Sequence, residues 1–175
     1  MNVAKAAAML SVSTALFVIH GAALGKGPSS EQAHFRAEDK TMPGLVALPP
    51  EALIILSKDT LAAWQIEESG GHAEQLFLAS EVTLGGNGEK AYVVRGDGPL
   101  RSVDAPVFWI FAQTAHGLKL VLRAPADELI LRKTHTFGHK DIDVLQGDSE
   151  PLLKTTFRFD GKQYELDRQT QAKLK

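Results

Sequence analysis

The chain has 175 residues, of which 44% are hydrophobic and 23% charged, and its formal net charge is −2. These proportions are typical of a globular protein and exclude collagen-like, low-complexity and wholly disordered chains. The sequence contains no cysteine, which excludes disulfides, thiolate catalysis, iron–sulfur clusters and cysteine-ligated zinc. The fold must therefore be stabilised by a buried core.

The first 25 residues have the pattern of a secretory signal peptide. Lys5 precedes an uncharged run from Ala6 to Ile19, and small residues follow from Gly21 to Gly25. The run is about 14 residues long, which is shorter than the roughly 20 residues of a membrane-spanning helix. We therefore expect cleavage near residues 23–25 and a periplasmic or secreted protein that does not insert in the membrane. Lipid attachment is excluded because it requires a cysteine at the cut.

The charge of the mature chain argues against two classes of partner. Removing Lys5 from the 19 basic residues leaves 18 against 21 acidic residues, so the mature net charge is −3, and no basic block is present. Nucleic acids and anionic membrane surfaces are therefore poor partners for this protein.

The rest of the chain is expected to be one domain with two loose ends. Residues 26–44 are polar and have no helical or strand periodicity, which predicts a flexible N-terminal arm. A single strand-rich domain is expected over residues 45–168, and residues 169–175 are expected to form a loose tail.

Two short helices are predicted at the start of the domain. Pro50 and the acidic residue after it are typical of a first helical turn and predict a helix over residues 52–57. Asp59 or Thr60 can cap a second helix. Trp64 is expected to lie on the core-facing side of that helix, so both helices should cover the core.

From residue 75 onward, short apolar runs separated by turn residues are typical of an antiparallel sheet. Residues 75–84 and 91–95 flank a glycine-rich turn and predict a hairpin. Val107–Ala112 is apolar on both faces, which predicts a central strand covered on both sides. Strands at 118–122 and 129–131 are expected to pair with each other. The predicted fold class is α+β, mainly antiparallel β-sheet with one or two short N-terminal helices.

The C-terminal segment predicts a second hairpin. A two-residue turn at Asp160-Gly161 would place Phe159 opposite Lys162 and Phe157 opposite Tyr164. The alternation then puts four side chains on one, buried face of the hairpin: Phe157, Phe159, Tyr164 and Leu166.

The densest group of titratable residues contains His135, His139, Asp141 and Asp143. Two imidazoles and two carboxylates invite a metal interpretation, but H-x-x-x-H shares a face only in a helix, and Gly138 favours a turn here. We therefore expect no metal and keep the four residues as candidates for binding a ligand.

No other pattern predicts catalysis. The sequence has no G-x-S-x-G elbow and no serine in a recognisable activating context, so we expect no catalytic residue and no cofactor. Trp64 and Trp109 are expected to be core side chains and not platforms for a sugar ring.

Four segments resemble, in this order, a group of uncharacterised secreted bacterial proteins: Leu84–Val94, Val107–Phe111, Gly138–Ile142 and Phe157–Tyr164. The resemblance implies a leader peptide, a short helix, a W-I-F strand and a terminal F-D-G-K-x-Y hairpin, and it implies no activity. The first of these segments is also similar to a degenerate D-x-N-x-D-G calcium loop. It offers one carboxylate and one amide where calcium needs several oxygen ligands, so a structural turn is expected.

These observations favour a secreted or periplasmic binding module without enzymatic activity, for example an inhibitor or immunity-type partner of an envelope or secreted protein. One alternative is a hydrolase of envelope polymers that uses Asp141, Asp143 or Glu81. Another alternative is a structural envelope subunit that joins other chains through the unpaired edge of the terminal hairpin.

Overall fold

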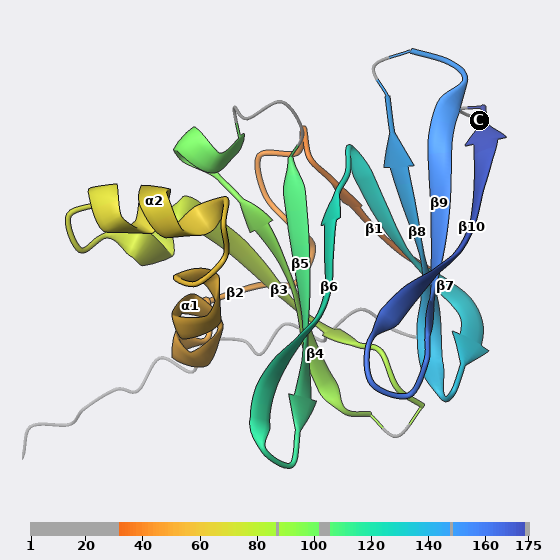
Figure 1. Ribbon diagram of the computed structural model, residues 1–175, viewed down its shortest axis with the longest axis horizontal. Coiled ribbons are helices and arrows are strands. Elements are labelled where there is room, and N and C mark those ends of the chain that lie inside the picture. The colour runs from red at the N-terminus through yellow and green to blue at the C-terminus, as the bar shows by residue number, and fades with distance from the viewer. Residues whose placement is uncertain (1–31, 87, 102–105, 148, 174–175) are drawn as a thin grey trace, which may run out of the picture.

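The computed structural model describes residues 32–86, 88–101, 106–147 and 149–173, so the expected signal peptide lies outside the described residues. The fold is α+β and mainly antiparallel, as predicted. Sheet A has the order β1-β7-β8-β9-β10, and sheet B has the order β2-β3-β4-β5-β6. The two sheets face each other, and the helices cover the other face of sheet B (Figure 1).

The strands of sheet A are β1 (Ala33–Arg36), β7 (Glu128–Thr136), β8 (His139–Gln146), β9 (Leu152–Phe159) and β10 (Tyr164–Ala172). Those of sheet B are β2 (Leu45–Val46), β3 (Phe77–Thr83), β4 (Lys90–Gly96), β5 (Val107–Thr114) and β6 (Gly117–Pro125). The helices are α1 (Pro50–Leu56) and α2 (Ala62–Glu68), with 3₁₀ turns at Ala73–Leu76 and Gly98–Arg101. None of the described helices is long and apolar enough to cross a membrane.

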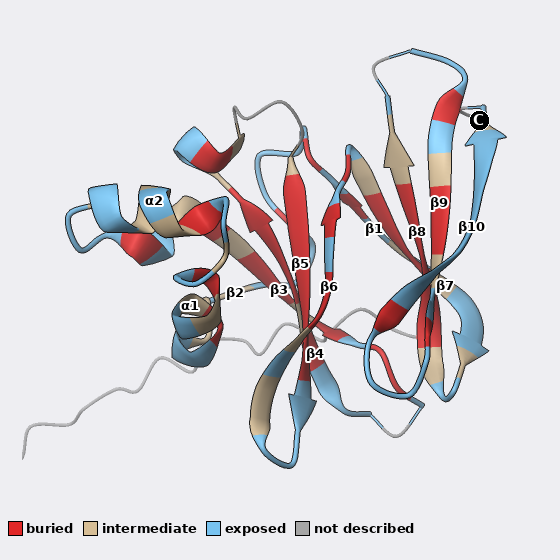
Figure 2. Cartoon of the chain, in the orientation of Figure 1, coloured by how far each residue is buried: buried red, intermediate tan, exposed pale blue. Residues whose placement is uncertain are grey.

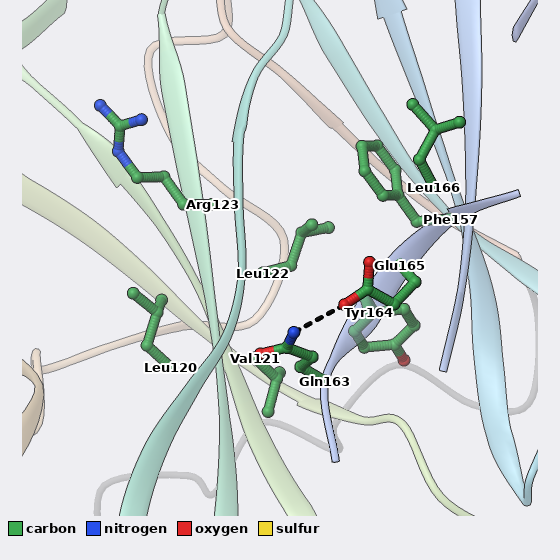
Figure 3. A pocket seen from close by; sticks show the side chains of 9 residues that line it. All are labelled: Leu120, Val121, Leu122, Arg123, Phe157, Gln163, Tyr164, Glu165 and Leu166. Carbon is green, nitrogen blue, oxygen red and sulfur yellow. Dashed lines mark hydrogen bonds between the residues drawn. The ribbon is translucent and has the colours of Figure 1, made fainter. Parts of the chain in front are cut away.

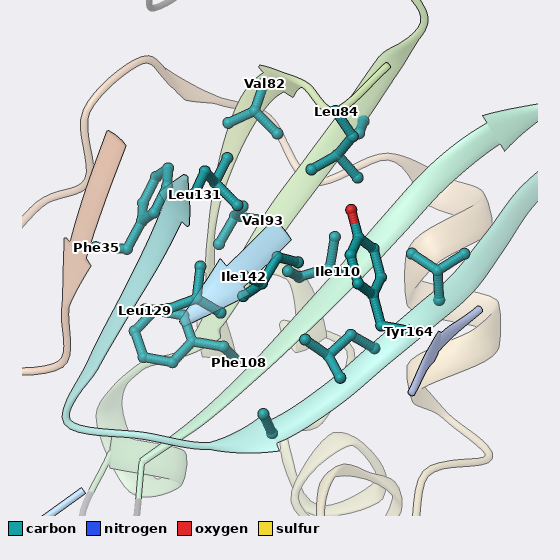
Figure 4. Packing of buried hydrophobic residues seen from close by; sticks show 14 of the residues in the cluster. Phe35, Val82, Leu84, Val93, Phe108, Ile110, Leu129, Leu131, Ile142 and Tyr164 are labelled. Atoms are coloured by element: carbon teal, nitrogen blue, oxygen red, sulfur yellow. The ribbon is translucent and has the colours of Figure 1, made fainter. Parts of the chain in front are cut away.

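Strand β5 is buried on both faces, as its apolar run predicts. Phe108 and Ile110 point into the core between the sheets, which Figure 4 shows. Trp109 and Phe111 point to the opposite side, into a second core beneath the helices. Figure 2 shows β5 buried along most of its length. One strand therefore belongs to two cores, and the helices, sheet B and sheet A form three layers.

The two helices form near the predicted positions, but α2 is rotated from the expected orientation. The Asp59 carboxylate accepts hydrogen bonds from the backbone N–H groups of Leu61 (2.9 Å) and Ala62 (3.3 Å), which fixes the start of α2. Ala62 is then buried and Ile66, one turn later, packs against the core. Trp64 lies between them in sequence, on another face of the helix, and is 59% exposed. The expectation that Trp64 is a core side chain is therefore wrong, whereas Trp109 is buried.

The predicted pairing of the strands at 118–122 and 129–131 is also wrong. Strand β6 pairs with β5 in sheet B, and β7 pairs with β1 and β8 in sheet A. The segment between them crosses from one sheet to the other. Its backbone N–H groups are satisfied by both sheets, because Ala126 donates to the Pro106 carbonyl and Asp127 to the Leu145 carbonyl. These hydrogen bonds take the place of a hairpin turn.

The predicted flexible arm is ordered over its described part, residues 32–44. Strand β1 pairs with β7, and Phe35 and Met42 are buried in the core between the sheets. The guanidinium of Arg95, on β4, is also fully buried and donates to the backbone carbonyls of Arg36 and Asp39. The carbonyl oxygens thus solvate a buried cation, and these hydrogen bonds attach the N-terminal segment to β4.

The terminal hairpin has the predicted faces but a different turn. Phe159 pairs with Tyr164 and Phe157 with Leu166, so the loop has four residues and the register is shifted by two from the prediction. A shift of two residues preserves the faces, because strand side chains alternate with a period of two. Phe159 and Tyr164 are buried and Phe157 is half-buried, but Leu166 is 55% exposed, so the expectation that it is buried is wrong. The expected loose tail is mostly strand, since β10 continues to Ala172.

Replacing the buried arginine tests how the N-terminal segment is held. Arg95→Met keeps much of the side-chain volume but leaves two carbonyls without donors, so we expect the free energy of unfolding to fall by about 2 to 4 kcal/mol. Hydrogen exchange at residues 36–42 should become faster in the same variant. The control is Arg101→Met, which removes a more exposed donor to the Glu38 carbonyl and should cost less than about 1 kcal/mol in a urea melt. Equal losses in the two variants would contradict the role given to Arg95.

Candidate functional site

A groove lies where the two sheets end beside each other, between β6 and β10. Each of these strands has a neighbour on one side only. The groove has a volume of about 420 Å³ and is shown in Figure 3. It is lined by four consecutive residues of β6, five residues of the terminal hairpin and no residue of any other element: Leu120, Val121, Leu122, Arg123, Phe157, Gln163, Tyr164, Glu165 and Leu166.

The wall formed by β6 is apolar because of a bulge. The pairing of β5 with β6 shifts between Ile110 and Phe111, so that Val121 has no direct partner. A bulge breaks the alternation of side chains. As a result, the consecutive residues Val121 and Leu122 both belong to the core between the sheets.

The opposite wall is the inner face of the terminal hairpin. Leu166 pairs with Phe157 and is the most exposed apolar side chain that lines the groove. The register of β10 shifts after Leu166, where Asp167 is skipped and Arg168 pairs with Thr156. The apolar row of β10 therefore ends at Leu166.

Two sets of hydrogen bonds hold the end of the groove that lies beside the turn between β9 and β10. The Lys119 ammonium, on β6, donates to the Lys162 carbonyl at 2.9 Å and so bridges β6 to the turn between β9 and β10. Within that turn, the Asp160 carboxylate accepts from the backbone N–H groups of Lys162 (2.7 Å) and Gln163 (2.8 Å). These two hydrogen bonds lower the pKa of Asp160 below its usual 3.8.

The floor is made rigid by Tyr164. Its hydroxyl group donates to the Lys140 carbonyl at 2.8 Å. Burial raises the pKa of Tyr164 well above its usual 10, and the charge of Asp141 raises it further. The phenol therefore stays protonated at neutral pH and acts as a structural hydrogen-bond donor. Burial also lowers the pKa of the Lys140 ammonium.

A second hollow of about 380 Å³ lies on the other side of β6, against α1 and the loop that follows it. Asp59 organises it, because its carboxylate forms an ion pair with Arg123 (3.0 Å) and accepts from the Trp109 indole N–H (3.1 Å). Leu120 and Arg123 line both hollows. Strand β6 thus separates the groove from the second hollow.

The structure separates the sequence-predicted candidates from this groove. Ile142 and Val144 of β8 point into the core, so Asp141 and Asp143 point to the outer face of sheet A. Both carboxylates are nevertheless buried, at 4% and 3% exposure, because neighbouring side chains cover them. Neither residue lines either hollow.

Hydrogen-bond donors and cations surround both carboxylates. Asp141 accepts from the hydroxyl groups of Thr134 (2.6 Å) and Thr136 (2.7 Å). Asp143 accepts from Thr156 (2.7 Å) and forms ion pairs with Lys154 (2.7 Å) and Arg132 (3.7 Å). These contacts are those of structural carboxylates that hold β7, β8 and β9 together.

The two histidines lie on opposite arms of a hairpin. His135 is on β7 and His139 on β8, with the turn at Phe137 and Gly138, as Gly138 predicts. His135 is exposed, whereas the ring of His139 stacks on Phe159 at 4.0 Å between ring centroids. Across the described ranges, no group of three or more histidine and acidic residues is placed to hold a metal ion.

The contacts of Asp143 predict that it contributes to stability. Asp143→Ala leaves Arg132 and Lys154 without their common counter-charge, so the free energy of unfolding should fall by about 2 to 4 kcal/mol in a urea melt. Asp167→Ala is the control, because its ion pair with Arg158 is more exposed and should contribute less than about 1 kcal/mol. An Asp143→Ala variant as stable as the wild type would contradict this role.

The turn beside the groove predicts a pH dependence. Because the folded-state pKa of Asp160 is lowered, its ionised form stabilises the fold above the unfolded-state pKa, and this contribution is lost as the pH falls through the folded-state value. Asp160→Asn keeps a side-chain acceptor but cannot ionise. The wild type should therefore be more stable than the variant at pH 6, and the difference should shrink toward pH 2. A difference that is the same at both pH values would contradict the shift.

A scan against protein-family models, a search of curated proteins and a search of solved structures each found no match for this chain.

Proposed function

We propose that the protein is an exported binding module without enzymatic activity, and that its ligand occupies the groove between β6 and β10. The observation that carries this proposal is an exposed apolar side chain, that of Leu166, in a groove whose other lining includes polar groups. Leu166 is 55% exposed there although its pairing partner Phe157 packs against the core. An apolar side chain left open in a hollow of about 420 Å³ is typical of a ligand site, which has a volume of about 300 to 1,000 Å³.

The contacts of the acidic residues favour binding over hydrolysis. Asp141 and Asp143 are engaged by threonine hydroxyl groups and by cations on the outer face of sheet A. Glu81 forms an ion pair with Lys90 at 3.1 Å. A glycoside hydrolase of the usual kind would need two carboxylates that converge on an open site. The groove has one carboxylate, Glu165, in its lining.

The terminal hairpin supports a structural envelope subunit less well than it supports a binding module. Beyond Leu166, the edge strand β10 has a bulge and carries Asp167 and Arg168. Charged side chains and bulges are devices that keep an edge strand from pairing with copies of itself. We therefore favour a specific partner, such as an envelope or secreted protein that this module inhibits or protects.

The experiment is affinity capture from an envelope extract with the tagged mature protein, analysed by quantitative mass spectrometry. Leu166→Glu places a charge on the groove wall and should reduce capture of the partner by about tenfold or more. Leu153→Glu is the matched control, because Leu153 is also an exposed leucine of sheet A, at 41%, but does not line the groove. Both variants should melt within a few degrees of the wild type, since neither residue is buried.

Two outcomes would contradict the proposal. The first is a partner that binds the Leu166→Glu and wild-type proteins equally well. The second is turnover of a glycan or peptide substrate that Asp141→Asn or Asp143→Asn abolishes without loss of the fold.

A further inference from the structure

We infer that the groove receives an extended segment of a partner polypeptide, which adds to sheet A as a strand beside β10 and carries a basic side chain next to Glu165. This inference rests on the proposed function and names the chemical class of the ligand. The backbone of β10, the two apolar walls and the charge of Glu165 each contribute to it.

The backbone of β10 offers a template for a strand. From Tyr164 to Leu166 it pairs with β9 in continuous register, and β10 is the last strand of sheet A. Half of its N–H and C=O groups therefore point away from β9, toward the side where β6 lies (Figure 3). An extended peptide supplies the complementary row of acceptors and donors, which a compact apolar ligand does not.

The walls define the side chains of such a segment. Alternate residues of a strand point to opposite faces of the sheet. On the inner face of sheet A, a strand beside β10 lies next to Leu166 and opposite Val121 and Leu122 of β6. The inward side chains of the segment should therefore be apolar, at every second position.

The ends of the groove limit the length of the segment. The bridge from Lys119 to the Lys162 carbonyl lies at one end, and the bulge of β10 after Leu166 ends the regular edge at the other. A strand occupies roughly 160 Å³ per residue, from its rise, its spacing and the distance between packed sheets. The volume of about 420 Å³ thus accommodates two or three residues of the core of the segment.

The outer side of the groove adds a charge preference. Glu165 is exposed and lines the groove, and its side chain accepts a hydrogen bond from the neutral amide of Gln163 at 2.6 Å. Its cross-strand neighbour Arg158 forms an ion pair with Asp167 instead. Within the described residues, no cation forms an ion pair with Glu165. A lysine or arginine at the outward position of an added strand would supply that cation.

The other three sheet edges are less suited to this role. Strand β6, the opposite wall of the groove, has a bulge at Val121 beside the groove. Strand β1 has four residues, and β2 has two. Strand β1 belongs to the N-terminal segment whose carbonyls bind Arg95, and β2 follows that segment in the chain. The β10 edge is in regular register beside the groove from Tyr164 to Leu166, and it is bordered there by the exposed side chain of Leu166.

A phage-displayed library of random dodecapeptides, selected on the full mature protein, tests the inference. We expect enriched peptides in which apolar residues alternate with polar ones and include a lysine or arginine. Their affinity, measured by titration of the synthetic peptide, should fall by about tenfold or more in Leu166→Glu and by less than about twofold in Leu153→Glu. Selection on Glu165→Lys should enrich aspartate or glutamate in place of the basic residue, and Glu165→Gln should show neither preference.

Methylation of the peptide backbone separates strand addition from simple apolar contact. Two versions of an enriched peptide are made, in which alternate amide nitrogens are methylated on one edge or on the other. The version that is methylated on the edge facing β10 should lose binding by about tenfold or more, because its N–H donors are removed. The other version should bind within about threefold of the parent peptide.

The outcomes distinguish this inference from the proposed function. Enrichment of no peptide that depends on Leu166, or equal effects of the two methylated versions, overturns strand addition. If decanoate, used as an acyl-chain probe, binds the wild type but not Leu166→Glu, the groove binds an apolar ligand and only the inference about peptides fails. Dimerisation in light scattering that Leu166→Glu abolishes would make a second copy the occupant and would likewise overturn it.

Discussion

Sheet B has to be buried on both faces, and the rest of the architecture follows from this constraint. Strand β5 presents Phe108 and Ile110 to one side and Trp109 and Phe111 to the other, all almost completely buried. A sheet with two apolar faces needs two covering layers. The helices provide one layer and sheet A the other, which leaves the outer face of sheet A to water. The polar groups around Asp141 and Asp143 lie on that face. The edge strands β6 of sheet B and β10 of sheet A lie beside each other where the core between the two sheets ends.

Local patterns predicted much of this architecture. The double-sided apolar run of β5, the hairpin at residues 77–96 and the helix after Pro50 are all present. The hairpin and the helix depend on interactions between residues that are near in sequence, whereas the burial of β5 was predictable because its own side chains are apolar on both faces. The faces of the terminal hairpin were also predictable, since the alternation of Phe157, Phe159, Tyr164 and Leu166 does not change when the turn lengthens by two residues.

The errors concern interactions between distant residues. Nothing near residues 32–44 indicates that Arg95, more than fifty positions later, holds this part of the chain through the backbone carbonyls of Arg36 and Asp39. Nothing local distinguishes a turn at 124–127 from a crossover that bonds to both sheets. The groove could not be predicted for the same reason. Most of its residues were assigned to strands correctly, although Gln163 lies in the turn and not in a strand. The position of β6 and β10 at the edges of two sheets is a property of the whole topology. The histidine and aspartate cluster drew attention by its density, although its carboxylates join strands.

The pairing of β1 with β7 has a consequence for the order in which the chain can fold. The side-chain contact between His34 and Glu128 joins residues 94 positions apart, and Ala33–Arg36 has its strand partner in that same distant segment. Closing so long a loop is slow compared with forming the hairpins of either sheet. A chain that emerges from the ribosome with its N-terminus first therefore keeps β1 unpaired until β7 has emerged. This pairing can begin only after residues 128–131 have emerged, when β8, β9 and β10 are still to follow.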